Sequence, residues 1–586
     1  MGDQNTPSTD PVVHMLRSVL SSGHRIPKWA VRSIVVIVTV LACGMLEAAP
    51  WRASGVTAPA VAQVSPVSTR VASLPTPTPT LVVVATKRPT PVPVSVDDIP
   101  AKIVATVEQE PVGFPPLSTY SESLRPEFKS MLSDLSHLTR YDMSVEIFPA
   151  QRMLKGTAVI TLRNNSAIAW PSIVFRLPAN HPRLHTDMYL ERVVVNGLSV
   201  QPVLSPSATV ATIPLASPLQ PDHWVRVEFT WFLGYEHLSD ESAYVRNGAN
   251  QDMINLPHFY PELAVHAPGA PGTDAMGWWI QEIPPHTDMR FHETVLMTVE
   301  AVAPSEYVLV GSGAPVHEEV MAHGRKRQRW VTGPVRGFVL QASPLYQVSS
   351  KDVDGVRIQS FYHAEDEPVA LRALDQAAEA LGFFSKAWIP YPYAHLTIVA
   401  SPLADTAMEY SNLIQIGVMR YRSHPWNTAF LVVHEVAHQW IYLLVHNDPV
   451  NHPGLDEGLA DLSYVYMMDT VDQNFNGSRH LGYWQHLNED FGSRFPGASP
   501  WWLAHPYHGF RHYHATHYRR PAVLLGEIWT YTGHEVFTDK LRHYMDQNLF
   551  RIATPEHLIG VFEGSVPQGQ LTELEEAIGI SAAPAS

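Results

Sequence analysis

The chain has 586 residues, of which 45% are hydrophobic, and its formal net charge is −16. This length suggests two to four domains, and the apolar fraction is ample for packed cores. The sequence has no basic stripe that would release counterions from phosphates, so we expect no nucleic-acid partner.

The first 50 residues resemble an export signal. An apolar run of thirteen residues, 34–46, follows basic residues at positions 17, 25, 28 and 32. The run is shorter than the roughly 20 residues of a transmembrane helix, but it suits the apolar region of a signal. We expect residues 1–50 to be an export signal or membrane anchor, with translation from Met15 an open alternative.

Cys43, the only cysteine, ends the segment VLAC at 40–43. This segment resembles a bacterial lipoprotein box with an imperfect second position, so Cys43 is the expected lipidation site. Two alternatives stay open: an uncleaved signal anchor, and cleavage near Ala48 and Ala49. With either a lipidated Cys43 or an uncleaved signal anchor, we expect an exported, cell-surface protein of bacterial type that is tethered to the membrane by its N-terminus. Cleavage at Cys43 would leave no disulfide within the chain.

A proline- and threonine-rich segment follows at 51–120, with twelve prolines and the sequence PTPTPT at 75–80. This composition cannot bury a core and favours an extended chain. We expect a linker between the envelope and the folded part. Apolar positions at helical spacing in 122–137 predict a short helix after it.

Two folded domains are expected after the linker. Residues 121–348 contain alternating segments, such as 157–163 and 224–231, separated by Pro, Asn and Gly turns, which predicts an N-terminal antiparallel β-sheet domain. Residues 349–586 begin with strands such as 395–400 and a helix near 368–385, and become mainly helical after 427. The predicted fold class is therefore α+β and multidomain, with a mainly helical domain second.

The segment HEVAH at 434–438 predicts a zinc centre. His434 and His438 are one helical turn apart, so both imidazoles can reach one metal ion. Glu457, eighteen residues later, would be the third ligand, leaving a fourth position open for catalysis. Glu435 lies beside the metal, where a carboxylate can deprotonate the attacking water.

The surrounding sequence supports this interpretation. Residues 427–445 are almost continuously apolar around the polar triad, as in a buried helix, and Asn447, Asp448 and Pro449 would end it. In a second apolar stretch, Asp461 follows Glu457 by one turn. A carboxylate at that spacing can orient a ligating histidine, although a solvated helix residue is the alternative.

These residues resemble the aminopeptidase N-type gluzincins, whose signature is HExxH, eighteen residues, then Glu. The family's upstream Gly-Ala-Met-Glu-Asn element is similar to TAMEY at 406–410, and its downstream Tyr-x-Lys-Gly-Ala element is similar to YRRPA at 518–522. The strand sequences at 141–147 and 154–162, and FYP at 259–261, also resemble the family. The resemblance covers roughly residues 138–575.

The resemblance implies that the mainly helical second domain is a thermolysin-like zinc peptidase domain, with one Zn²⁺ ion and peptide substrates. It gives Tyr518 the role of donor to the oxyanion, and it places Ala407, Met408 and Glu409 in the substrate cleft. In the family, the glutamate of the Met-Glu element pairs with the substrate's free α-ammonium, which is the basis for reading peptide amino termini. We therefore expect such a protein to remove N-terminal residues from peptides.

The sequence departs from the family pattern in four places. Thr406 replaces Gly and Tyr410 replaces Asn, Arg520-Pro521 replaces Lys-Gly, and Gly454 stands where Trp is common. The chain also ends at Ser586, so it resembles a short bacterial form without the C-terminal helical domain. These departures leave two alternatives open: a broader endo- or oligopeptidase, and a catalytically silent peptide-binding surface protein.

Other candidate site residues have weaker support. A second side chain is expected to bind the substrate amine. The candidates are Glu282, Glu262 and Asn255, and no motif selects one of them. Five histidines in 501–518 lack regular ligand spacing, so a polar loop is favoured over a second metal site. For the pair Trp278 and Trp279, we expect a buried contact in the β-domain and not a substrate contact.

Overall fold

The computed structural model describes residues 115–240, 243–250, 252–284, 287–423, 428–491 and 509–579. The predicted export signal, Cys43 and nearly all of the predicted linker lie outside these residues. Among the helices of the described ranges, none is long and apolar enough to span a membrane. The division at residues 348 and 349 stays a prediction, since 94–586 form one compact unit.

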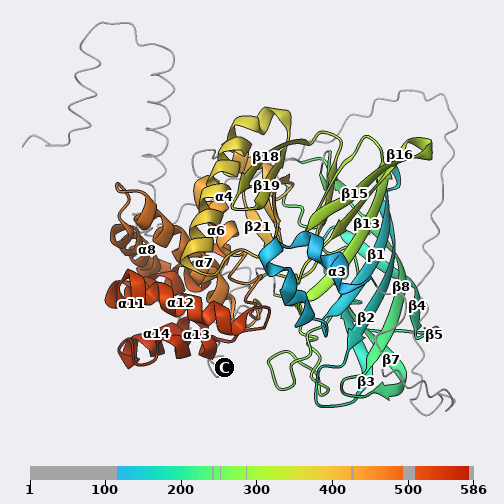
Figure 1. Ribbon diagram of the computed structural model, residues 1–586, viewed down its shortest axis with the longest axis horizontal. Coiled ribbons are helices and arrows are strands. Elements are labelled where there is room, and N and C mark those ends of the chain that lie inside the picture. The colour runs from blue at the N-terminus through green and yellow to red at the C-terminus, as the bar shows by residue number, and fades with distance from the viewer. Residues whose placement is uncertain are drawn as a thin grey trace, which may run out of the picture. The chain divides into compact units, whose positions relative to one another are not determined.

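An eight-stranded sheet forms the largest part of the N-terminal region (Figure 1). Strand β8 alternates between buried and partly exposed residues along most of its length, as expected for a sheet with one face on the core. All pairs are antiparallel except β1 and β13, which are parallel. In sheet order the strands are β15 (Ala314–Met321), β16 (Arg325–Val331), β13 (Val295–Pro304), β1 (Thr139–Phe148), β2 (Met153–Arg163), β8 (Trp224–Tyr235), β4 (Thr186–Val195) and β5 (Leu198–Val200).

Two smaller sheets complete this region. The first contains, in order, β14 (Val308–Gly311), β17 (Leu340–Ser343), β11 (Met253–Leu256), β10 (Gly248–Asn250) and β9 (His237–Leu238). The second contains β12 (Glu262–Leu263), β3 (Trp170–Arg176), β7 (Val210–Leu219) and β6 (Val203–Leu204). Ahead of the strands, 122–137 form mainly a 3-10 helix, Pro126–Ser133, after the short α3 (Leu117–Tyr120), and not the single α-helix predicted there.

A five-stranded mixed sheet opens the second region and carries the helix α4 (Glu367–Ala387) against it. Its strands, in order, are β18 (Gln347–Val353), β19 (Val356–Tyr362), β20 (His395–Ser401), β22 (Leu413–Gly417) and β21 (Ala407–Tyr410). Strand β21 is therefore the edge strand of this sheet, and among the described residues it pairs with β22 only. An edge strand is where an extended peptide can add to a sheet.

Helices make up most of the described chain after this sheet (Figure 1). They are α5 (Val418–Ser423), α6 (Thr428–Ala437), α7 (Pro453–Val471), α8 (Gly477–Phe491), α10 (Gly509–His514), α11 (Arg520–Thr532), α12 (His534–Asn548), α13 (Pro555–Phe562) and α14 (Gln568–Ile578). A π-helical turn, Ala515–Arg519, joins α10 to α11. The order of a β-sheet region followed by a helical region confirms the predicted fold class.

The helix with the HEVAH segment is shorter than predicted. It ends at Ala437, and turns occupy the following residues, up to Leu444, that the sequence assigns to the same helix. Tyr442 has a left-handed backbone, with φ of 82°, through which an α-helix cannot continue. Its hydroxyl lies within hydrogen-bond reach of the Asp288 carboxylate and of the carbonyl of Arg290, so contacts with the N-terminal region hold this turn.

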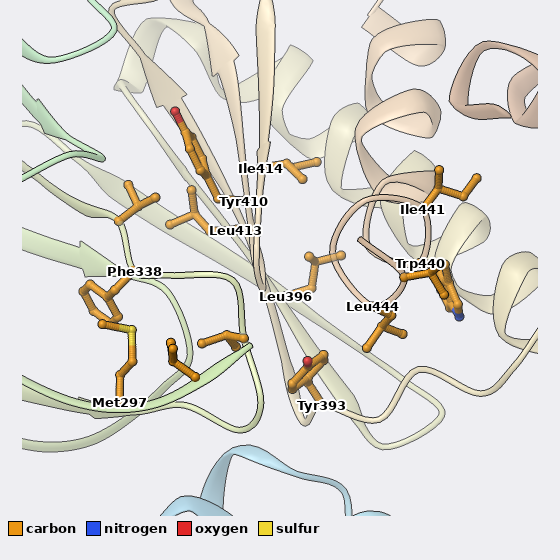
Figure 2. Packing of buried hydrophobic residues seen from close by; sticks show 14 of the residues in the cluster. Met297, Phe338, Tyr393, Leu396, Tyr410, Leu413, Ile414, Trp440, Ile441 and Leu444 are labelled. Carbon is orange, nitrogen blue, oxygen red and sulfur yellow. The ribbon is translucent and has the colours of Figure 1, made fainter. Parts of the chain in front are cut away.

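One hydrophobic core runs through both regions. Figure 2 shows Met297 and Phe338 of the N-terminal region, Leu396 and Leu413 of the five-stranded sheet, and Trp440 after α6 within that core. All five are at most 2% exposed. The segment that presents the predicted zinc ligands is thus fixed by packing on the side away from the site.

Candidate metal centre and active site

The predicted zinc ligands come together at α6 and α7. His434 lies on α6, and His438 follows its end while its backbone N–H still bonds to the carbonyl of His434. Glu457 lies in the first part of α7. The Nε2 atoms of the histidines are 3.0 Å apart, and Oε2 of Glu457 lies 3.2 Å from the first and 3.3 Å from the second.

These distances fit one tetrahedral zinc ion. Zn–N bonds of about 2.0–2.1 Å place neighbouring ligand atoms about 3.3 Å apart. Oε2 of Glu457 is buried and accepts no hydrogen bond from the described residues, which suits an atom that faces a cation. Nitrogen and carboxylate donors are the set that zinc prefers, and three of them leave one position open.

The other ring nitrogen of each histidine has a partner that fixes its tautomer. Nδ1 of His434 lies 3.0 Å from Oδ1 of Asp461, and Nδ1 of His438 donates to the carbonyl of Ile441 at 3.3 Å. Each Nε2 is therefore the unprotonated nitrogen that a metal needs. Asp461 occupies the position that the sequence predicts for a carboxylate that orients a ligating histidine.

Glu435 is buried beside the ligands and 4% exposed. Burial raises the pKa of its carboxyl to about 8; His434 lowers it, and Glu457 and Asp461 raise it. A carboxylate with a pKa in this range holds a proton taken from water more firmly than an ordinary glutamate does. Oε2 of Glu435 has no hydrogen-bond partner among the described residues, so it is available to a bound water.

Tyr518 lies in the π-helical turn that leads into α11. Its hydroxyl donates to Oε1 of Glu457 at 2.6 Å, whereas Oε2 of that carboxylate faces the two histidines. The phenol is therefore at the rim of the ligand triad, 61 residues from Glu457 in sequence. Burial raises the pKa of Tyr518 well above its usual value, and the charge of Glu457 raises it further, so the phenol keeps its proton.

Glu409 lies on the edge strand β21 with Ala407 and Met408, and it is 5% exposed. Burial raises the pKa of its carboxyl well above the usual value, and the carboxylates of Glu435 and Glu457 raise it further, whereas Arg246 lowers it. A buried carboxyl of this kind ionises when a cation lies beside it. The side chain is thus within the electrostatic reach of the metal site.

A buried polar group from the N-terminal region adjoins Glu409, and the sequence does not predict it. Arg246 forms an ion pair with Asp288, whose other oxygen accepts the Tyr442 hydroxyl. The guanidinium of Arg290 lies 4.2 Å from the ring centroid of Tyr410, the residue that replaces the family's Asn. Arg246, Asp288 and Arg290 lie 144 to 188 positions before His434 and form no motif with it, so only the tertiary structure reveals them.

The three candidates for a second substrate-amine group all have other partners. Glu282 accepts hydrogen bonds from Ser207 and Thr209, at 2.9 and 3.4 Å. Glu262 lies between two buried histidines, and the amide of Asn255 donates to backbone carbonyls. The geometry therefore favours none of them as an anchor for a substrate.

Other weakly supported residues also have structural roles. Trp278 and Trp279 are each 1% exposed, and they pack in the N-terminal region as expected. A Cβ atom on Gly454 would lie 2.9 Å from the carbonyl of Ala577 in α14, which explains the absence of the bulky residue that is common there. The histidines at 505 and 508 lie outside the described residues, while His514 and His517 lie beside Tyr518.

Comparison with known proteins agrees with this geometry. Residues 372–575 match the Peptidase family M1 domain. Aminopeptidase M1 of Arabidopsis thaliana is 25% identical over 298 residues, which are 46% of this chain and 32% of that protein. Aminopeptidase M1-A of Oryza sativa subsp. japonica is 24% identical over 295 residues, 44% of this chain and 31% of that protein. The chain thus spans about a third of the length of these relatives.

Solved structures share the fold over most of the described residues. The M1 zinc metallopeptidase of Deinococcus radiodurans matches with a TM-score of 0.57 and 17% identity, over 76% of this chain and 94% of that one. A two-domain M1 zinc metallopeptidase mutant with bound L-tryptophan matches with a TM-score of 0.56 and 17% identity, over 76% of this chain and 95% of that one. The family is one of zinc enzymes, and the His434–His438–Glu457 site fits one zinc ion. Residues 372–575, which contain the HEVAH segment, Glu457 and Tyr518, are therefore similar to the Peptidase family M1 domain, in agreement with the sequence motifs.

Proposed function

We propose that the protein is a zinc-dependent aminopeptidase that removes N-terminal residues from peptides. The observation that carries the proposal is the placement of Glu409, a buried carboxyl on an edge strand, beside a three-ligand zinc site. The names of its relatives, which are aminopeptidases and M1 zinc metallopeptidases, support the same reaction class.

The residues of the site have separate tasks in this reaction. His434, His438 and Glu457 would hold the zinc ion, which would polarise the scissile carbonyl and lower the pKa of water to about 7. Glu435 takes the proton of the attacking water and then donates it to the leaving amine. Tyr518 donates its hydroxyl hydrogen to the developing oxyanion.

Glu409 explains why a free amino terminus would be preferred. The α-ammonium of a peptide is a cation that lets the buried carboxyl ionise, and the resulting charge-assisted hydrogen bond holds the first residue. The open edge of β21 pairs with the peptide backbone that follows. An acetylated peptide offers no such cation.

Hydrolysis of two matched peptides, one with a free amino terminus and one acetylated, tests the proposal. We expect the zinc-loaded protein to cleave only the free peptide and the Glu435→Gln variant to cleave neither. Cleavage of both peptides by the unmutated protein would indicate an endo- or oligopeptidase. Cleavage of neither would instead support a catalytically silent peptide-binding protein.

We also propose that the protein acts outside the cell, tethered to the membrane through its N-terminus. The support is the apolar run 34–46, Cys43 and the proline-rich segment that follows. Expression of the whole chain in a bacterium, with fractionation and labelled fatty acid, tests this. We expect label on the unmutated protein and none on Cys43→Ala; label on neither, with the protein in the membrane, would indicate a signal anchor.

A further inference from the structure

The catalytic-site tyrosine has a close aromatic neighbour four residues earlier in the chain. The rings of His514 and Tyr518 are nearly parallel, with centroids 4.3 Å apart and planes 9° apart. His514 is the last residue of α10, and Tyr518 lies in the π-helical turn Ala515–Arg519 that joins α10 to α11. Such turns insert an extra residue into a helix and are frequent at functional sites.

The other rings near Tyr518 are too distant to replace this contact. The ring centroid of His434 lies 6.1 Å away, and that of Tyr513 lies 6.3 Å away and meets Tyr518 by an edge. A face-to-face contact of 4.3 Å is the range in which stacked rings attract. Within the part of the chain that the structure describes, His514 makes the closest ring contact with Tyr518.

The hydrogen bond of Tyr518 cannot hold the ring throughout the reaction. Its one hydroxyl hydrogen is donated to Glu457 at 2.6 Å, but the same hydrogen is needed by the developing oxyanion. When the hydroxyl turns to the substrate, the bond to Glu457 is given up. Another contact has to fix the plane of the ring at that moment, because the donor must lie about 2.7–3.1 Å from the oxyanion.

We propose that His514 is a positioning residue for Tyr518 and holds the phenol ring in place while its hydroxyl leaves Glu457 for the substrate oxygen. This inference rests on the proposed function, since it assigns Tyr518 the donor role. His514 itself touches no reacting atom. Its contribution belongs to the transition state, so its loss lowers kcat and leaves KM nearly unchanged.

Steady-state kinetics on a peptide with a free amino terminus test the inference. We expect His514→Ala to lower kcat about three- to tenfold, the equivalent of one aromatic stacking contact, with KM within about twofold. His514→Phe keeps a flat ring and should restore kcat. An unchanged kcat in His514→Ala, or no rescue by Phe, would overturn the inference.

The chain offers a matched control for this substitution. His534 stacks on Tyr466 with centroids 4.9 Å apart and planes 7° apart, on the helix pair α12 and α7, and it also lies 3.2 Å from that tyrosine's hydroxyl. The site proposed above does not use either ring. His534→Ala removes a comparable stack and should leave kcat unchanged; an equal fall in kcat would show that loss of any such stack has this effect.

A double-mutant cycle shows whether His514 acts through Tyr518. In the Tyr518→Phe background no hydroxyl remains to be positioned, so we expect His514→Ala to cause no further loss of kcat. Losses that multiply would show that His514 acts through the general stability of the site, which contradicts the inference.

A readout without turnover separates this inference from the proposed function. With 3-fluorotyrosine at position 518, ¹⁹F NMR should show one resonance in the unmutated protein and in His514→Phe, and a shifted or split resonance in His514→Ala. An unchanged spectrum in His514→Ala overturns the inference even if the protein is a peptidase. Lack of peptide hydrolysis by the unmutated protein would overturn the proposed function instead.

Discussion

Asp461 orients His434 from behind, at 3.0 Å from Nδ1 of the ring. Replacing it by Asn removes the charge that favours the correct tautomer. We expect Asp461→Asn to weaken zinc binding about 10- to 100-fold, measured by competition with a chelator. Asp469→Asn is the matched control on the same helix, because an amide oxygen can still accept the N–H of Gly477. Equal zinc affinity in both variants would contradict this role of Asp461.

Glu409 is the residue on which substrate selection depends in the proposed function. Glu409→Gln cannot ionise, so we expect kcat/KM for a free peptide to fall about 10- to 100-fold, as for the loss of a hydrogen bond to a charged group. The ratio between free and acetylated peptides should fall with it. Glu282→Gln serves as the control, because Ser207 and Thr209 already occupy that carboxylate. Unchanged discrimination in Glu409→Gln would rule out the anchor role.

Residue spacing alone predicts only those site residues that lie one helical turn apart. His434, Glu435 and His438 follow from the rise of one helical turn, and Asp461 from the same spacing relative to Glu457. Glu409 and Tyr518 are predictable only through resemblance to a family. Arg246 and Asp288 are brought to the site by tertiary contacts alone, and no spacing rule links them to it.

At the scale of elements, helix α7 approaches α11 closely because two of its residues lack side chains. A Cβ atom on Gly458 would lie 2.4 Å from Cβ of Pro521, and one on Gly454 would lie 3.1 Å from its Cγ. Glu457 lies beside this contact, and Pro521 is the second residue of α11, the helix that follows Tyr518. The packing of Gly458 against Pro521 therefore sets the distance between the zinc ligand Glu457 and Tyr518.

Two glycine-to-alanine substitutions compare a packed helix with an open one. Gly458→Ala should destabilise the protein, because the backbones of α7 and α11 must separate to admit the methyl group. Gly482→Ala, on α8 with no atom near the added Cβ, should stabilise it by about 0.5–1 kcal/mol. Urea denaturation of both variants measures the free energies of unfolding. A neutral or stabilising Gly458→Ala would show that the helices can move apart freely.

Element types followed well from periodicity, whereas their partners and ends did not. Alternation predicted strands at 157–163 and 224–231, and both lie in strands, β2 and β8, which pair with each other. The parallel pairing of β1 with β13 joins segments about 150 residues apart, and no local pattern encodes it. The helix α6 ends at Ala437 because Tyr442 bonds to Asp288 and Arg290, which sequence patterns cannot indicate.

At the scale of the whole molecule, buried polar groups join the N-terminal region to the helical region. The guanidinium of Arg336 donates to the carbonyls of His292 and Arg551, at 2.8 and 2.9 Å. Thr294 donates to the carbonyl of Phe550 at 2.9 Å. Separation of the regions would break these bonds together and expose the shared hydrophobic core to water. We infer that the two regions unfold together.

His446 belongs to the same contact and is held as a neutral imidazole. Nδ1 donates to the carbonyl of Tyr442 at 2.6 Å, and Nε2 accepts the backbone N–H of His292 at 3.2 Å. A proton on Nε2 would face that N–H. Burial lowers the pKa of His446 well below its usual value, and the charge of Arg336 lowers it further.

This tautomer makes the stability of the molecule depend on pH in a defined direction. The unfolded chain protonates His446 near pH 6.5, whereas the folded protein does not, so the unfolded state binds more protons below that pH. The stabilisation is therefore complete above about pH 6.5 and is lost as the pH falls below it, by up to about 1.4 kcal/mol per pH unit.

Substitution of His446 by Gln tests this dependence apart from any change in overall stability. The amide of Gln can donate one hydrogen bond and accept another, but it does not titrate. We expect the free energy of unfolding to fall less steeply between pH 7 and pH 5 in His446→Gln than in the unmutated protein. Parallel curves for the two proteins would show that His446 is protonated equally in both states. A difference equivalent to about one proton between the two slopes of unfolding free energy against pH would instead show that His446 limits the stability of the protein in acid. The physical reason is that the contact between the two regions admits only the neutral form of His446.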